Sequence, residues 1–180
     1  MVYVFLADGF EEIEALTPVD LLRRAGVRVT TLGVGGKREI KGAHGVTVLA
    51  DAPDADFADD APDMVILPGG MPGAANLDAS PAVAAALAKT AAAGGFLAAI
   101  CAAPMVLGHK GYLAGKKATC YPGFEGELKG ATPKKAPVVR DGNVITGAGM
   151  GVAAEFALEL VAALCGKEKA ATLERGILKA

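Results

Sequence analysis

The sequence predicts an α/β fold with a doubly wound, mostly parallel sheet and helices on both of its faces. Short continuous apolar runs rich in β-forming residues recur along the chain, as expected of strands buried on both faces. Segments with helical apolar spacing separate these runs, and glycines or prolines mark most of the boundaries. Because the chain shows no linker and no internal repeat, we expect a single domain over residues 1–180.

Two kinds of strand are expected. Buried strands are predicted at residues 2–7 (VYVFLA), 27–34 (VRVTTLGV), 63–70 (DMVILPGG) and 96–100 (FLAAI). Shorter strands are predicted at 116–119 and in a hairpin over 136–147 around Asp141 and Gly142. A hairpin-like excursion is predicted at 38–51.

Helices are predicted between these strands. Residues 13–26 have a helical apolar stripe and a glycine stop at Gly26. Residues 80–95 begin with Ser80 as N-cap and Pro81 at the first helical position. A further helix has Pro104 in its first turn, a long helix covers 151–166, and a charged helical piece closes the chain.

Composition excludes several classes of protein. The net charge of −2 comes from dispersed residues, so no basic surface for nucleic acid is expected. Hydrophobic residues make up 52% of the chain, yet the longest apolar run is about 13 residues and contains a proline, whereas a membrane-spanning helix needs about 20. Three scattered cysteines and two histidines form no zinc quartet, and the N-terminus lacks signal-peptide features. We therefore expect a cytoplasmic protein with free thiols, no metal and no cofactor.

Functional residues are expected where the parallel strands end, because ligands bind outside the carboxyl ends of such strands. Cys101 lies where one strand turns directly into a helix, and the amides of a helix N-terminus lower the pKa of a thiol. The small neighbours Ala99, Ala102 and Ala103 leave room for a tight turn like those that present nucleophiles. A core cysteine explains this position equally well from the residues alone.

Two other strand ends carry groups that could serve such a cysteine. Gly69 and Gly70 could turn backbone N–H groups toward an anion as an oxyanion hole, although a plain tight turn also fits them. Glu11 and Glu12 fit the first turn of a helix, where carboxylates are favoured by the helix dipole. Glu14 lies just inside the apolar stripe and is the better candidate for a carboxyl group that shares or shuttles a proton with a thiol.

A dinucleotide site is not expected. The stretch 147–152 (GAGMGV) has Val152 at the third glycine position, and no further strand or ribose-binding acid follows it. His109 lies too far along the helix after Cys101 to face the sulfur and is expected at the surface. His44 is either a loop residue or a residue that lines the site from a neighbouring segment.

Taken together, these residues resemble the ThiJ/PfpI family of the class I glutamine amidotransferase-like superfamily. Four stretches match the family in order over nearly the whole chain: ADGFEEIEALTPVDLLRRAG, VILPGGMPGAANL, AAICAAPMVL and EFALELVAALCGKEKA. The resemblance implies a flavodoxin-like α/β sandwich, a homodimer, and a cysteine on a strained elbow between a strand and a helix. It favours the nucleophile over the core interpretation of Cys101.

The resemblance also implies roles for single residues. Cys101 would be the nucleophile, and Glu14 the carboxyl group hydrogen-bonded to it. The backbone N–H groups of Gly69, Gly70, Cys101 and Ala102 would stabilise an oxyanion.

Other positions match or depart from the family pattern. Arg24 matches a family arginine near the dimer interface. Relatives have a histidine where this chain has Tyr121, which counts against a cysteine–histidine peptidase. Tyr121, Cys120 and His44 are expected to line the pocket. Val152 replaces a threonine of relatives.

The resemblance implies a cysteine-dependent enzyme that acts on reactive carbonyls. A glutathione-independent glyoxalase or protein deglycase would convert α-oxoaldehydes or early glycation adducts into hydroxy acids without a cofactor. The alternative is a stress-sensing or chaperone-like protein whose cysteine is oxidised, and a peptidase is the weakest alternative. Expected partners are a small carbonyl substrate or glycated protein and a second copy of the chain, but neither nucleic acid nor a membrane.

Overall fold

A seven-stranded sheet forms the centre of the computed structural model, which describes residues 1–57 and 61–178. The strand order is β10-β11-β7-β6-β1-β2-β5, and all neighbouring pairs are parallel except β10 and β11. The strands are β1 (Val2–Leu6), β2 (Val29–Gly33), β5 (Ala52–Pro53), β6 (Met64–Leu67), β7 (Phe96–Ile100), β10 (Val138–Asp141) and β11 (Val144–Gly147). This arrangement confirms the predicted doubly wound, mostly parallel α/β fold.

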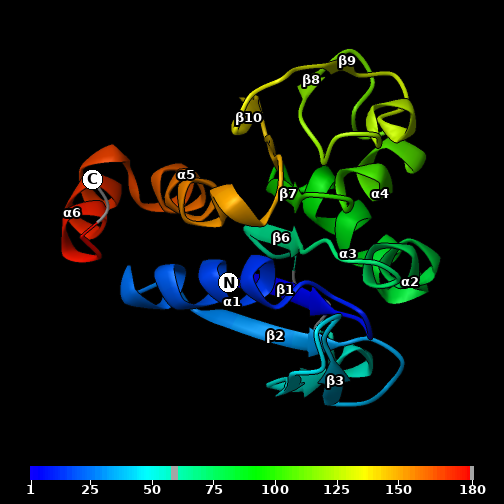
Figure 1. Ribbon diagram of the computed structural model, residues 1–180. Helices are drawn as coiled ribbons and strands as arrows, with labels where there is room; N and C mark the ends of the chain where they lie inside the picture. The colour runs from blue at the N-terminus through cyan, green and yellow to red at the C-terminus, as the bar shows by residue number, and fades with distance from the viewer. Residues whose placement is uncertain (58–60, 179–180) are drawn as a thin grey trace.

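Helices cover both faces of the sheet (Figure 1). On one face lie α1 (Glu12–Arg24), α5 (Ala153–Cys165) and α6 (Lys167–Gly176), and on the other α2 (Gly73–Ala79), α3 (Pro81–Ala92) and α4 (Pro104–His109). None of these helices, nor any other in the described part of the chain, is long and apolar enough to cross a bilayer.

Each face of the sheet has its own hydrophobic core. Val4 and Ile66 pack with α1 and α5, whereas Phe5 and Leu67 pack with the helices of the opposite face. Successive strand residues point to opposite faces, so both sets of side chains must be apolar. This requirement explains the continuous apolar runs in β1 and β6, in which every residue is buried.

The predicted helices and hairpins form largely as expected, with one omission. The Ser80 hydroxyl accepts a hydrogen bond from Val83 N–H (3.3 Å), and Pro81 opens α3. The sequence did not predict α2, because its stretch begins at Gly73 and offers only Leu77 as a large apolar anchor. In α2, Leu77 is fully buried, so tertiary packing outweighs poor helix propensity.

Two small sheets stand apart from the central one. The predicted excursion at 38–51 is an antiparallel hairpin of β3 (Glu39–Lys41) and β4 (Thr47–Leu49). The strand predicted at 116–119 is reduced to β8 (Lys117–Ala118), which pairs with β9 (Thr132–Pro133). The 3-10 turns are η1 (Asp54–Asp56), η2 (Glu125–Glu127) and η3 (Met150–Val152).

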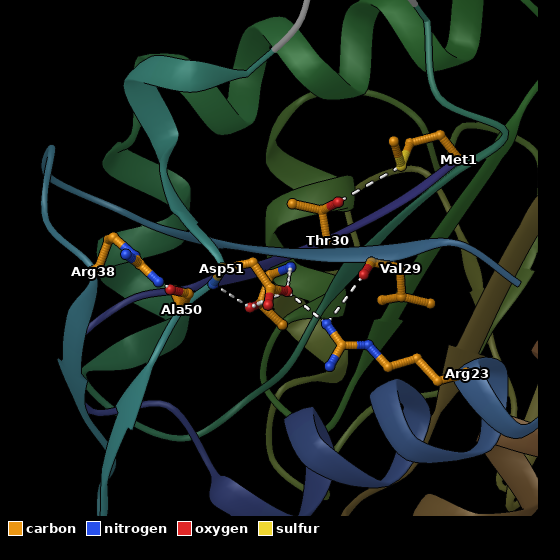
Figure 2. Close-up of polar contacts among 8 residues, drawn as sticks. Met1, Arg23, Val29, Thr30, Arg38, Ala50 and Asp51 are labelled. Carbon is orange, nitrogen blue, oxygen red and sulfur yellow. Dashed lines mark hydrogen bonds and ion pairs between the residues drawn. The ribbon is translucent and has the colours of Figure 1, made fainter.

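Asp51 connects the last turn of α1 to the edge of the sheet (Figure 2). Its Oδ2 atom accepts hydrogen bonds from Arg23 (2.6 Å) and from both the backbone N–H and the hydroxyl of Thr31 (2.8 Å each). Burial alone would raise the pKa of Asp51, but these hydrogen bonds and the Arg23 charge lower it below the ordinary value. The carboxylate therefore joins α1 and β2 to the segment between β4 and β5, in which Asp51 lies.

We expect Asp51→Asn to lower the free energy of unfolding by about 1–3 kcal/mol, because hydrogen bonds to charged groups contribute that much. Urea denaturation followed by circular dichroism measures the change. The control is Asp20→Asn, which removes only an exposed ion pair with Arg24 and is expected to cost less than about 1 kcal/mol. Equal losses for the two variants would contradict the structural role of Asp51.

Candidate functional site

Cys101 lies at an elbow between β7 and α4, as the sequence predicts. Its φ angle is +64°, in the left-handed region that non-glycine residues rarely adopt. Its N–H donates to the Gly147 carbonyl (2.9 Å), and its carbonyl accepts from Tyr121 N–H (2.8 Å). The thiol is half-buried at the carboxyl edge of the sheet, while the small side chains of Ala102 and Ala103 are buried beneath the turn. Neighbouring backbone therefore holds the strained elbow in place.

Glu14 brings a buried carboxyl group from α1 to this thiol. The residue is 1% exposed, and its carboxyl group is hydrogen-bonded to the thiol of Cys101. Its Oε2 atom accepts the Gly69 N–H at 2.9 Å, whereas Oε1 is buried and has no hydrogen-bond partner within the described residues. One carboxylate oxygen thus fixes the side chain, and the other is available to a proton.

Gly69 and Gly70, the two glycines that follow β6, have different functions. The N–H of Gly70, together with that of Ala102, faces the sulfur of Cys101. The N–H of Gly69 is instead occupied by Glu14, so the expectation that Gly69 supplies an oxyanion donor needs correction. Gly69 is required for another reason. A Cβ atom there would lie 2.7 Å from the Cys101 Cβ and 2.7 Å from Glu14 Oε2.

We expect Gly69→Ala to lower the free energy of unfolding by about 1–3 kcal/mol, because the added methyl overpacks the site. Glu14 and Cys101 must then move apart, so reactivity of the thiol toward iodoacetamide should change as well. Urea denaturation and mass spectrometry measure the two effects. Gly126→Ala is the control, since a Cβ there meets nothing within 4 Å. Wild-type behaviour of Gly69→Ala would contradict the tight packing described above.

Burial raises the pKa of both groups of this pair, and their contact shifts the two values in opposite directions. Burial raises the pKa of Glu14 to about 7, against the opposing hydrogen bonds from Cys101 and Gly69. Burial, and next the Glu14 carboxylate, raise the pKa of Cys101 to about 12. The amides of Gly70 and Ala102 lower the pKa of this thiol, as predicted from the helix start, but burial and Glu14 outweigh them. At neutral pH the Cys101 thiol is therefore protonated, while Glu14 is near the midpoint of its titration.

The three residues expected to line the pocket, Tyr121, Cys120 and His44, lie in different places. Tyr121 is 51% exposed beside the elbow, to which its backbone is bonded. Cys120 is buried and lines a cavity of about 660 Å³, and neither Cys101 nor Tyr121 belongs to that lining. Burial and then the Glu125 charge raise the pKa of Cys120 to about 11.

Neither His44 nor Arg24 contacts the thiol in the hydrogen bonds and ion pairs of the described residues. His44 lies in the β3–β4 hairpin, and its Nδ1 atom is 3.1 Å from Glu12 Oε2. Arg24 is exposed and pairs with Asp20 (2.7 Å) one turn earlier in α1. Glu12 therefore binds the hairpin rather than simply capping α1. Because Glu12 and His44 are 32 residues apart in the sequence, their contact leaves no local signal there.

Gly147 is a site residue whose role the sequence did not predict. Its carbonyl accepts the Cys101 N–H, and a Cβ atom on it would lie 2.9 Å from Ile100 Cγ1. The position of the TGAGMG stretch at the end of a strand was the available signal.

The fold and this elbow define a class of α/β protein with a cysteine–carboxyl pair at the carboxyl edge of a parallel sheet. The family model described as DJ-1/PfpI family matches residues 1–163, so the chain belongs to that family. This finding confirms the family resemblance of the sequence.

Relatives and solved structures cover almost the whole chain. The chain is 41% identical over 179 residues to Protein dj-1beta of Drosophila melanogaster, covering 98% of this chain and 96% of that protein. It is 34% identical to the glutathione-independent glyoxalase DJR-1.2 of Caenorhabditis elegans, covering 91% and 87%. The structure of oxidized Toxoplasma gondii DJ-1 has a TM-score of 0.96 at 37% identity, covering 99% and 98%.

Proposed function

We propose that this chain is a cysteine-dependent enzyme that converts small α-oxoaldehydes or early glycation adducts into hydroxy acids. The observation that carries the proposal is the buried hydrogen-bonded pair of Cys101 and Glu14, with two amides directed at the sulfur. The name of the Caenorhabditis elegans relative, a glutathione-independent glyoxalase, supports the same reaction class.

The first step is addition of the thiol to the aldehyde. As the sulfur of Cys101 attacks the aldehyde carbon of methylglyoxal, its proton passes to the carboxylate of Glu14. The developing oxyanion is stabilised by the N–H groups of Gly70 and Ala102 and takes the proton back from Glu14 to become a hydroxyl group, which leaves Glu14 ionised again. The product is a hemithioacetal, with no change in oxidation state.

The second step moves hydrogen between adjacent carbons. Glu14 removes the proton from the hemithioacetal carbon, which leaves an enediolate, and returns it to the neighbouring carbon. The hydroxyl proton of the first carbon moves to the oxygen of the second. The former aldehyde carbon is now a thioester and the former ketone carbon carries a hydroxyl group. Water hydrolyses the thioester to lactate and regenerates the Cys101 thiol. The substrate supplies both the oxidised and the reduced carbon, so no cofactor or glutathione is needed.

The wild-type protein tests this proposal directly. We expect it to form lactate from methylglyoxal in the absence of glutathione and metal ions, measured by an enzymatic lactate assay. Methylglyoxal loss without lactate would indicate simple adduct formation and would contradict the proposed reaction.

A second candidate function is oxidation sensing through the same cysteine. The half-buried sulfur faces the amides of Gly70 and Ala102, which could hold the oxygens of a sulfinate. Mass spectrometry after mild peroxide treatment should then find oxygen on Cys101 before Cys120 or Cys165. Equal oxidation of the three cysteines would count against this candidate. Both histidines pair with carboxylates elsewhere, so we do not propose a peptidase.

We also propose that the chain forms a homodimer through α1 and the β3–β4 hairpin. These two elements expose four large apolar side chains, Ile13, Leu16, Val46 and Leu49, at 39–63%. Such a patch on adjoining elements is typical of protein contacts, and Arg24 lies on the same helix. We expect wild type to sediment as a dimer and Leu16→Asp as a monomer. A monomeric wild-type protein would contradict the proposed interface.

A further inference from the structure

A group of side chains with the chemistry of metal ligands lies outside the Cys101 site. It is located where the start of α1 contacts the β3–β4 hairpin. Glu11, Glu12 and His44 each place one ligand atom there, and these atoms all lie within 4.8 Å of one another. It is the only such group of three within residues 1–57 and 61–178.

Two of the three distances in this group fit coordination of one ion. His44 Nδ1 lies 3.1 Å from Glu12 Oε2 and 3.3 Å from Glu11 Oε2. Two ligand atoms of a tetrahedral zinc ion with bonds of about 2.0–2.1 Å are separated by about 3.3 Å. Hydrogen bonding alone explains the arrangement less well, because Nδ1 carries at most one proton and two carboxylates converge on it.

The β3–β4 hairpin fixes the position of the Glu12 carboxylate through its backbone. Glu12 is 8% exposed, and its Oε1 atom accepts the His44 N–H at 2.9 Å, which leaves Oε2 for an ion. The chain makes room for this carboxylate at Gly42, where a Cβ atom would lie 2.3 Å from Glu12 Oε1. Such outer contacts orient metal ligands and tune their affinity.

We propose that Glu11, Glu12 and His44 bind one divalent first-row transition-metal ion, with Zn²⁺ as its representative. One imidazole nitrogen and two carboxylate oxygens suit Zn²⁺, whereas Ca²⁺ and Mg²⁺ prefer a shell made only of oxygen atoms. In the single chain the side chain of His44 is 70% exposed, so the remaining coordination positions are open and can hold water. The expectation of no metal rested on the cysteines and histidines of the sequence and did not consider Glu11 and Glu12 as ligands.

The second histidine of the chain provides a matched comparison. His109 also lies between two carboxylates, with Nδ1 2.7 Å from Asp78 Oδ2 and Nε2 2.8 Å from Glu127 Oε2. These contacts use opposite nitrogens of the ring, so a single ion cannot be held by all three side chains. The Asp78 carboxylate also pairs with Lys110 (2.8 Å). His109→Ala is therefore a control with the same chemistry and the wrong geometry.

Isothermal titration calorimetry with Zn²⁺ tests the proposal on the full chain. We expect wild type to bind one equivalent, His44→Ala and Glu11→Gln to bind at least tenfold more weakly, and His109→Ala to bind within twofold of wild type. Circular dichroism checks that each variant is folded. No binding by wild type, or binding by His44→Ala equal to that of wild type, would overturn the proposal.

Cobalt substitution separates this site from binding by the thiols. Co²⁺ held by nitrogen and oxygen ligands shows only visible ligand-field bands, and these should disappear in His44→Ala. A near-ultraviolet thiolate-to-cobalt band that is lost in Cys101→Ser would place the ion at the thiol and overturn the assignment. Neither experiment depends on turnover of methylglyoxal. Failure of the metal site would therefore not contradict the proposed enzymatic function, and failure of that function would not contradict the metal site.

Discussion

Replacing Cys101 by serine is expected to lower kcat/KM for conversion of methylglyoxal to lactate by at least about 10⁴-fold, because removal of a nucleophile has effects of that size. A serine hydroxyl is far less acidic than a thiol, and in this buried position it would not ionise beside Glu14. The thioester intermediate could not form. The measurement is lactate formation at several substrate concentrations with enzyme confirmed as folded by circular dichroism.

Cys165→Ser is the matched control for this substitution. Cys165 is exposed at the end of α5 and lies outside the contacts described for the elbow, so we expect wild-type kinetics. Cys101→Ser activity within tenfold of wild type would show that another group carries the reaction. Equal losses in both variants would indicate a general effect of cysteine replacement.

The sequence predicts the frame of the protein well because that frame depends on local patterns. Continuous apolar runs specify strands buried on both faces, and β1, β6 and β7 form where those runs lie. The elbow was also visible in the sequence. A buried strand ends at Cys101, and Pro104 marks the beginning of a helix three residues later, which leaves little chain for anything but a tight turn.

The electrostatics of the site could not be predicted in the same way. The amides that lower the pKa of the thiol are implied by a helix start, but the burial that outweighs them depends on packing against segments far away in the sequence. The partner of Gly69 is Glu14, 55 residues earlier, and nothing local distinguishes an amide bound to a carboxylate from one free to bind a substrate oxygen. Long-range pairing is likewise what joins His44 to Glu12.

Glu14→Gln is expected to lower kcat/KM by about 10²–10⁴-fold, because glutamine can keep the hydrogen bond from Gly69 but cannot carry a proton between substrate atoms. The active form of the pair has an ionised Glu14 and a protonated Cys101. We therefore expect wild-type kcat/KM to rise about tenfold between pH 6 and pH 8, as Glu14 loses its proton near its pKa of about 7. Any residual activity of Glu14→Gln should lack this rise.

The same substitution should change how stability depends on pH. The folded-state pKa of Glu14 is raised to about 7 from an ordinary value of 4.5, so the folded protein binds this proton more tightly than the unfolded chain. Its contribution to stability is fully present below the unfolded pKa and is lost as the pH rises through about 7. The loss amounts to about 3 kcal/mol at most, which Glu14→Gln, having no proton to lose, should not show.

Urea denaturation of both proteins between pH 4 and pH 8 measures this difference. Other groups titrate in the same range, so the quantity to compare is the unfolding free energy of wild type minus that of Glu14→Gln at each pH. Glu39→Gln, an exposed residue of β3, is the control and should follow wild type at every pH. A difference between wild type and Glu14→Gln that stays constant with pH would show that Glu14 is ionised as easily in the folded protein as in the unfolded chain. Glu14 would then be ionised throughout the range from pH 6 to pH 8, and the rise of kcat/KM expected there would lose its physical basis.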